Sequence, residues 1–179
     1  IDNRSVNLSL ARAYYEMRDL NNALLYANRS IKDNPSLLEA HVIKGKTFLN
    51  TDKTDSALYY ADYVTGNIPC HGEALLLKSQ VMLLKEQYHN AVSDAQKAID
   101  CGETGNEALL QTALAYIYSG MNEKAMEMIE KIVSIENKTF TYWKNKATTL
   151  ITEKHYANAI FCAEIAAALK PTAREPYSI

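Results

Sequence analysis

One small residue recurs through this chain at a strict interval of 34 residues. Its positions are Ala23, Ala57, Ala91, Ala125 and Ala159. A second set of small residues stands twelve positions earlier, at Ala11, Gly45, Ser79, Ala113 and Ala147. Small side chains at two fixed places let two antiparallel helices approach closely, because a larger side chain would push the backbones apart. The chain is therefore predicted to contain five copies of one helix-turn-helix unit.

Each unit is expected to hold two helices of three to four turns joined by a short turn. The first helices are predicted at 5–17, 38–51, 72–85, 106–119 and 140–153. The second helices are predicted at 21–34, 55–67, 89–101, 123–136 and 157–170. The turns within the units carry polar residues that suit helix ends, such as Arg18–Asp19 and Ser119–Gly120.

The overall composition is that of a folded chain with no electrostatic preference for nucleic acid. Hydrophobic residues make up 47% of the 179 residues and charged residues 22%, which is typical of globular proteins. The formal charge is −2, and no block of like charge occurs. Nucleic acid and anionic membranes are therefore not expected as main partners. No apolar run approaches the roughly 20 residues that cross a bilayer, so membrane insertion is not expected either.

The three cysteines, Cys70, Cys101 and Cys162, are odd in number and far apart. This pattern argues against a disulfide framework and mildly favours a reducing compartment. The sequence assigns no compartment beyond that.

No residue pattern typical of a catalytic or metal site is present. The four histidines are scattered, and neither H-E-x-x-H nor C-x-x-C spacing occurs. The adjacent pair Cys70–His71 is interpreted as part of a turn. The segment Gly102–Gly105 lacks the lysine and the preceding strand that a phosphate loop requires. The sequence therefore predicts no enzyme activity, no metal and no cofactor.

The residues at these spacings resemble the tetratricopeptide repeat family, whose unit of 34 residues has a W–LG–Y–A–F–A–P type of pattern. Trp143 fills the large aromatic place of that pattern. The proline that closes the unit is present as Pro35, Pro69 and Pro171. Glu103 and Asn137 replace it in the third and fourth units, so the turns there are expected to differ.

The resemblance implies an all-α fold, a right-handed superhelical solenoid of five 34-residue helix-turn-helix repeats. The expected repeats are 4–37, 38–71, 72–105, 106–139 and 140–173, and residues 174–179 begin a truncated sixth. Residues 1–179 then form a single array, cut from a longer one.

In proteins that resemble this chain, the first helices line a concave groove that holds a peptide or a partner helix. The partner-binding residues expected from the resemblance are Arg12, Lys46, Leu76, Gln80, Leu83, Leu84, Leu110, Leu114, Ile117, Tyr118 and Lys144. Among them, Leu84, Leu114 and Tyr118 are expected to form an exposed apolar cluster and hence the binding hot spot. The alternative is that neighbouring units cover these three side chains.

Three acidic residues, Glu39, Glu73 and Glu107, share one place at the start of successive first helices. They could form an acidic stripe for a basic ligand, or they could complement the helix dipole at each helix start. The second interpretation is favoured. The same region lacks the cationic clamp with which some members of the family hold the carboxylates of cytosolic chaperone tails, so that role is disfavoured.

The function that the resemblance implies is a non-catalytic scaffold that binds a protein or peptide in its groove. Two alternatives stay open: a periplasmic or cell-envelope segment of an export or assembly machine, and a substrate-recruiting region of a larger enzyme or sensor. Self-association through uncapped terminal repeats is also possible, because the last predicted helix is apolar on more than one side.

Overall fold

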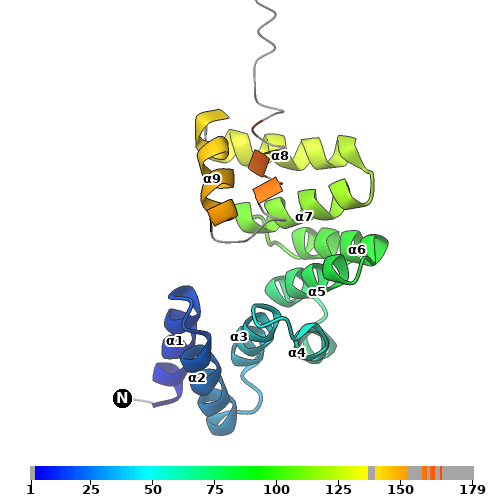
Figure 1. Cartoon of the computed structure of the whole chain (residues 1–179). Coiled ribbons are helices and arrows are strands. Elements are labelled where there is room, and N and C mark those ends of the chain that lie inside the picture. Colours follow the sequence, from blue (N-terminus) through cyan, green and yellow to red (C-terminus); the bar gives the residue numbers. More distant parts are fainter. Residues whose placement is uncertain (1–2, 137–139, 153–158, 161, 164–165, 167–179) are drawn as a thin grey trace, which may run out of the picture. The chain divides into compact units, whose positions relative to one another are not determined.

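The computed structural model of the chain describes residues 3–136, 140–152, 159–160, 162–163 and 166. All elements in these residues are helices joined by turns (Figure 1). The chain divides into two compact units, Ile1–Ala125 and Met126–Ile179. The all-α fold predicted from the sequence is confirmed.

The described helices follow the predicted ranges to within two residues at each end. They are α1 (Asn3–Glu16), α2 (Leu20–Asp33), α3 (Leu38–Leu49), α4 (Thr54–Asn67), α5 (Gly72–Leu84), α6 (Tyr88–Asp100), α7 (Asn106–Tyr118), α8 (Asn122–Glu136) and α9 (Phe140–Thr152). Of the helix expected at 157–170, the described residues 159–160, 162–163 and 166 are helical. The remainder of that helix, Pro171 and the start of a sixth repeat at 174–179 lie outside the described residues.

The two sets of small residues form the centre of the helix packing, as predicted. Every member of both sets is buried. A Cβ atom on Gly45 would lie 2.6 Å from Leu77 Cδ2 and 3.2 Å from Tyr60 Cβ, so α3 approaches its neighbours too closely for a larger residue. Ser79 instead uses its hydroxyl, which donates a hydrogen bond of 2.8 Å to the carbonyl oxygen of Ala91. The strict 34-residue period is therefore a packing requirement.

Within the first unit, each helix contacts the next helix along the chain from α1 to α7. The first helices of successive repeats also contact one another, in the pairs α1 with α3, α3 with α5, and α5 with α7. These four helices thus lie against one another on one face of the unit, which we call the first-helix face.

The turn inside each of the first four repeats has one left-handed residue. These residues are Arg18 (φ 61°), Asp52 (φ 58°), Glu86 (φ 59°) and Gly120 (φ 74°), spaced 34 residues apart. In each turn the next residue donates its N–H to a carbonyl five residues back; Gln87 N, for example, lies 2.9 Å from Met82 O. This is the Schellman arrangement, which satisfies carbonyl groups at a helix end. Only the fourth turn uses glycine, the residue best suited to positive φ.

We expect Glu86→Gly to raise the free energy of unfolding by up to about 1 kcal/mol. A left-handed conformation costs a residue with a Cβ atom roughly 1–2 kcal/mol, and the greater chain entropy of glycine offsets part of that gain. Gly120→Ala is the reciprocal control and should lower the stability. Urea midpoints followed by circular dichroism test both changes, and a lower midpoint for Glu86→Gly would contradict the prediction.

The link between repeats depends on whether the closing proline is present. Before Pro35 and Pro69, the C-cap residues Asn34 and Ile68 are extended, with φ of −148° and −129°, as a following proline requires. Glu103 keeps its N–H and donates it to Ala98 O at 3.0 Å, with Gly102 at φ 97°. The chain therefore leaves α6 through a left-handed turn, which proline at 103 could not form because it has no N–H.

A disulfide links this turn to the preceding repeat. It joins Cys70, just before α5, to Cys101, the C-cap of α6, and the two Cα atoms lie 5.4 Å apart. The expectation that the cysteines form no disulfide is therefore wrong. Their separation of 31 residues is close to one repeat length, and stacking brings the same ends of adjacent repeats together. The preference for a reducing compartment loses its basis, because disulfides persist mainly in oxidising environments.

Candidate functional site

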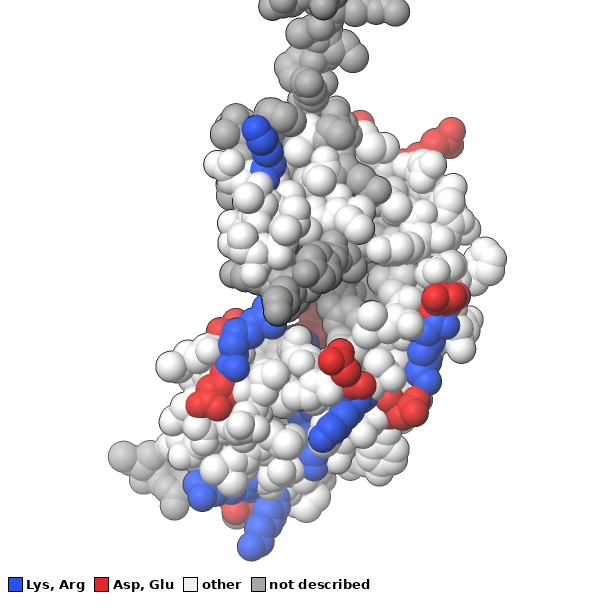
Figure 2. Space-filling model, viewed as in Figure 1, with Lys and Arg blue, Asp and Glu red and all other residues white. Residues whose placement is uncertain are grey.

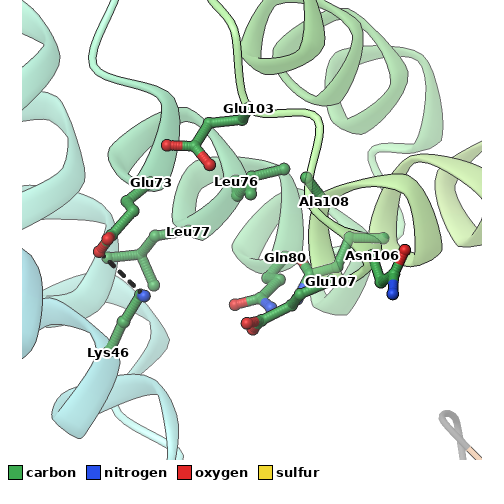
Figure 3. A pocket seen from close by; sticks show the side chains of 11 residues that line it. Lys46, Glu73, Leu76, Leu77, Gln80, Glu103, Asn106, Glu107 and Ala108 are labelled. Carbon is green, nitrogen blue, oxygen red and sulfur yellow. Dashed lines mark hydrogen bonds and ion pairs between the residues drawn. The ribbon is translucent and has the colours of Figure 1, made fainter. Parts of the chain in front are cut away.

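A cavity of about 260 Å³ opens on the first-helix face of the first unit. It is lined by Lys46 of α3, by Glu73, Leu76, Leu77 and Gln80 of α5, by Glu103 and Gly105 of the loop after α6, and by Asn106, Glu107, Ala108 and Gln111 of α7. Figure 3 shows how the labelled side chains of this lining lie. We call this cavity the acidic pocket.

The helical period explains why these residues meet. The α5 residues Glu73, Leu76, Leu77 and Gln80 stand at intervals of three and four, so they share one side of the helix. Leu76 and Leu77 are buried and form the apolar floor, whereas Gln80 is only partly buried. Helix α5 therefore contributes both apolar and polar side chains to the lining of the cavity.

One ion pair spans the pocket between adjacent repeats. Lys46 Nζ lies 3.1 Å from Glu73 Oε2 (Figure 3). Partial burial raises the pKa of the Glu73 carboxyl, but the charge and hydrogen bond of Lys46, with the charges of Arg12 and His71, outweigh it and hold that pKa below its ordinary value. Glu73 is therefore ionised at neutral pH.

The pKa of Tyr15, on α1, is influenced by charged side chains of other first helices. Burial is the main cause of the raised pKa of Tyr15; Lys46 lowers it, as does the hydrogen bond of 2.8 Å that Asn50 donates to the Tyr15 hydroxyl. Glu107 of α7 adds to the rise. The pKa of Tyr15 therefore depends on charged side chains of α3 and α7 as well as on its own burial.

The described charges visible on one face of the molecule are mixed in sign. On the face drawn in Figure 2, basic and acidic side chains lie beside each other. Among the described residues, no group of three or more His, Cys, Asp or Glu residues is arranged to hold a metal ion. None of the described helices is both long enough and apolar enough to span a membrane.

Comparison with known proteins identifies the family of the repeat in one part of the chain. Residues 107–139 match the family model described as tetratricopeptide repeat. A stretch of 91 residues, 49% of the chain, is 31% identical to the tetratricopeptide repeat and J domain-containing co-chaperone DNJ1 of Mycosarcoma maydis. Residues 107–139 are thus assigned as a tetratricopeptide repeat, and about half of the chain is similar to a protein that carries such repeats. The match spans only 16% of the length of that co-chaperone.

Solved tetratricopeptide repeat structures share the fold. TTC0263, a thermophilic TPR protein of Thermus thermophilus, is 18% identical, with a TM-score of 0.71 over 95% of this chain and 93% of its own. YrrB, described as a TPR protein with an unusual peptide-binding site, is 16% identical, with a TM-score of 0.60 over 93% of this chain and 86% of its own. At these identities the likeness concerns the fold.

In the structure, only some of the expected binding residues lie together. Lys46, Leu76 and Gln80 line the acidic pocket. Arg12 is exposed on α1, and Leu83, Leu110 and Ile117 are partly buried on their first helices. Lys144 is exposed on α9 in the second unit.

The expected hot spot is only partly exposed. Leu84 and Tyr118 expose 60% and 42% of their surface, and the Tyr118 ring stacks on Tyr88 with centroids 5.8 Å apart. Leu114 exposes only 7%, so the expectation that it is exposed is wrong. It lies in the stretch 112–116 of α7, where every residue is buried, and α7 packs against both α5 and α6. Burial of Leu114 was the alternative that the sequence left open.

Several residues that line the acidic pocket are not among the binding residues predicted from the sequence. The sequence favours Glu73 and Glu107 as charges that complement the helix dipole, and it places Glu103 where the closing proline of the repeat would stand. The recurrence of acids at the starts of first helices was the signal that could have found the first two. Nothing in the spacing indicates that Glu103 joins them, because its position depends on the left-handed turn at Gly102.

Proposed function

We propose that this chain is a non-catalytic scaffold that binds other proteins, and that its concave first-helix groove holds a peptide or a helix of the partner. The observation that carries this proposal is the acidic pocket, to which three successive repeats contribute side chains. The proposed partner-binding residues of this groove lie in the first unit; they are Arg12, Lys46, Leu76, Gln80, Leu83, Leu84, Leu110, Ile117 and Tyr118. Lys144, on α9 of the second unit, stays a prediction of the sequence. The description of YrrB as having a peptide-binding site supports a peptide as the ligand, since the fold is shared.

The size of the pocket favours one inserted side chain over a whole small molecule. Its volume of about 260 Å³ lies below the roughly 300–1,000 Å³ of pockets that bury drug-sized ligands. A peptide that places one side chain in the pocket would gain further affinity from contacts along the neighbouring first helices. Leu84 and Tyr118 offer exposed apolar surface for such contacts.

A selection of displayed random peptides against the purified chain tests this proposal. Gln80→Trp places a large ring at the pocket and is expected to lower the affinity of selected peptides at least about tenfold. Tyr59→Trp is the matched control, because Tyr59 is exposed on the second helix α4 and does not line the pocket. Circular dichroism verifies that both variants fold. If the selected peptides bind Gln80→Trp as well as they bind the unaltered chain, the proposed face is wrong.

The similarity to a co-chaperone favours a second candidate, a recruiting region of a larger protein. The name of that relative joins tetratricopeptide repeats to a J domain, and the match spans 16% of its length. In this setting the repeats would deliver a bound protein to an activity carried elsewhere in the parent chain. A parent sequence with a catalytic or J domain would support this candidate. A cell-envelope setting and self-association through terminal repeats stay predictions of the sequence.

A further inference from the structure

The acidic pocket holds more negative charge than its own residues balance. Glu73, Glu103 and Glu107 line it together with one basic residue, Lys46. Lys46 pairs with Glu73 at 3.1 Å, and the influence of Arg12 also falls on Glu73. Glu103 and Glu107 have no ion-pair partner in the described part of the chain. Two carboxylates are therefore available to an incoming positive charge.

A buried acceptor in the same pocket lacks a hydrogen-bond donor. The side-chain oxygen of Gln111 is buried and accepts no hydrogen bond from the residues that the structure describes, and Gln111 lines the pocket. An unsatisfied buried polar group of this kind costs about 1–3 kcal/mol. This oxygen and the carboxylates of the pocket are all hydrogen-bond acceptors, so the chemistry complementary to this lining is that of a donor.

The backbone around Glu103 holds this carboxylate over the start of α5. A Cβ atom on Gly72 would occupy the space of the Glu103 side chain, so glycine at 72 is what makes room for it. The left-handed turn at Gly102 and the disulfide from Cys101 to Cys70 hold the two backbone segments together. The backbone of Glu103 is therefore held by the fold beside the start of α5.

The acceptors are too widely placed for a single metal ion. Figure 3 shows Glu73 and Lys46 on one side of the pocket, Gln80 and Glu107 on the other, and Glu103 above them. No group of three such ligands is arranged for a metal among the described residues. A guanidinium group, with five N–H donors in a planar fork and no acceptor, can reach several separated acceptors at once. An ammonium group offers the same charge at a single point.

We propose that the acidic pocket binds a cationic side chain, an arginine or a lysine, from a basic extended segment of the partner protein. This inference rests on the proposed function, because it names the partner chemistry of the same face. It assigns the binding of a basic ligand to Glu73 and Glu107, two of the three acidic residues at the starts of the first helices. Glu103, from the turn between repeats, joins them. Glu39, the third of these acidic residues, is exposed and does not line the pocket.

The displayed peptides whose binding is lost in Gln80→Trp are the probes for this inference. We expect each of them to contain an arginine or lysine whose replacement by citrulline or norleucine, respectively, lowers affinity by about tenfold or more, the loss typical of a charge-assisted hydrogen bond. The double variant Glu103→Gln with Glu107→Gln should lower affinity for the basic peptide by a similar factor and leave the neutral analogue unaffected. Isothermal titration calorimetry measures both.

Glu39→Gln is the matched control for general charge attraction. It removes an acid from the same repeat position, outside the pocket, and should leave affinity unchanged. If Glu39→Gln weakens binding as much as the double variant does, or if the neutral analogue binds as tightly as the basic peptide, the inference is overturned while the proposed function stands. If no selected peptide loses affinity for Gln80→Trp, the proposed function fails and the inference fails with it.

Discussion

Replacing Cys70 and Cys101 by serine is expected to lower the free energy of unfolding by about 3–4 kcal/mol. The disulfide closes a loop with a sequence separation of 31 residues, and chain-entropy arguments give about 3 kcal/mol for a 15-residue loop and about 4.7 for a 100-residue loop. The bond joins adjacent repeats, so its loss should weaken their stacking as well. Thermal and urea midpoints of the oxidised chain and the double variant measure the change.

Chemical reduction provides the control for this prediction. A thiol reductant should lower the midpoint of the unaltered chain toward that of the double variant and leave the double variant itself unchanged. Peptide mapping under non-reducing conditions should recover the Cys70 peptide joined to the Cys101 peptide. Equal sensitivity of both proteins to the reductant would show that the effect comes from elsewhere.

Leu75→Ala is expected to destabilise the chain by about 2–5 kcal/mol. Leu75 exposes only 2% of its surface and packs in a core cluster with Leu76, Ala98 and Ala108, so truncation removes buried apolar area and leaves a cavity. It stands at the repeat position that Trp143 fills in the last repeat. The measurement is the urea midpoint together with the slope of the transition, which reports whether the array still unfolds cooperatively.

The same helix offers a chemically identical control. Leu84→Ala removes the same atoms from a side chain that is 60% exposed, and surface changes of this kind usually stay within about 0.5 kcal/mol. A large loss in Leu84→Ala, or a negligible one in Leu75→Ala, would mean that the core of this repeat is assigned wrongly.

The helices could be predicted to within two residues because their packing depends on local spacing. A Cβ atom on Gly45 would crowd Leu77 and Tyr60, and Ser79 is fully buried, so the 34-residue period of small residues marks the helix pairs and hence the turns. The left-handed turns after first helices follow from the same frame. These features are periodic in the chain, and periodicity is visible without coordinates.

The features that escaped prediction depend on which distant residues meet. Cys70 and Cys101 are far apart in sequence and become neighbours only when repeats stack. Leu114 looks like a groove residue by position, yet the contacts of α7 with α5 and α6 bury it. Glu103 enters the pocket because a missing proline frees its N–H for a left-handed turn. Each outcome is decided by neighbours in space, which spacing alone does not identify.

The disulfide next to the pocket has a consequence for the thermodynamics of recognition. Cys101 stands two residues before Glu103, and Cys70 stands two residues before Gly72, so the bond fixes both segments that place this carboxylate. Backbone segments that are already ordered in the free protein lose little conformational entropy when a complex forms. The covalent bond between adjacent repeats thus preorganises the segments that carry Glu103 for the proposed ligand.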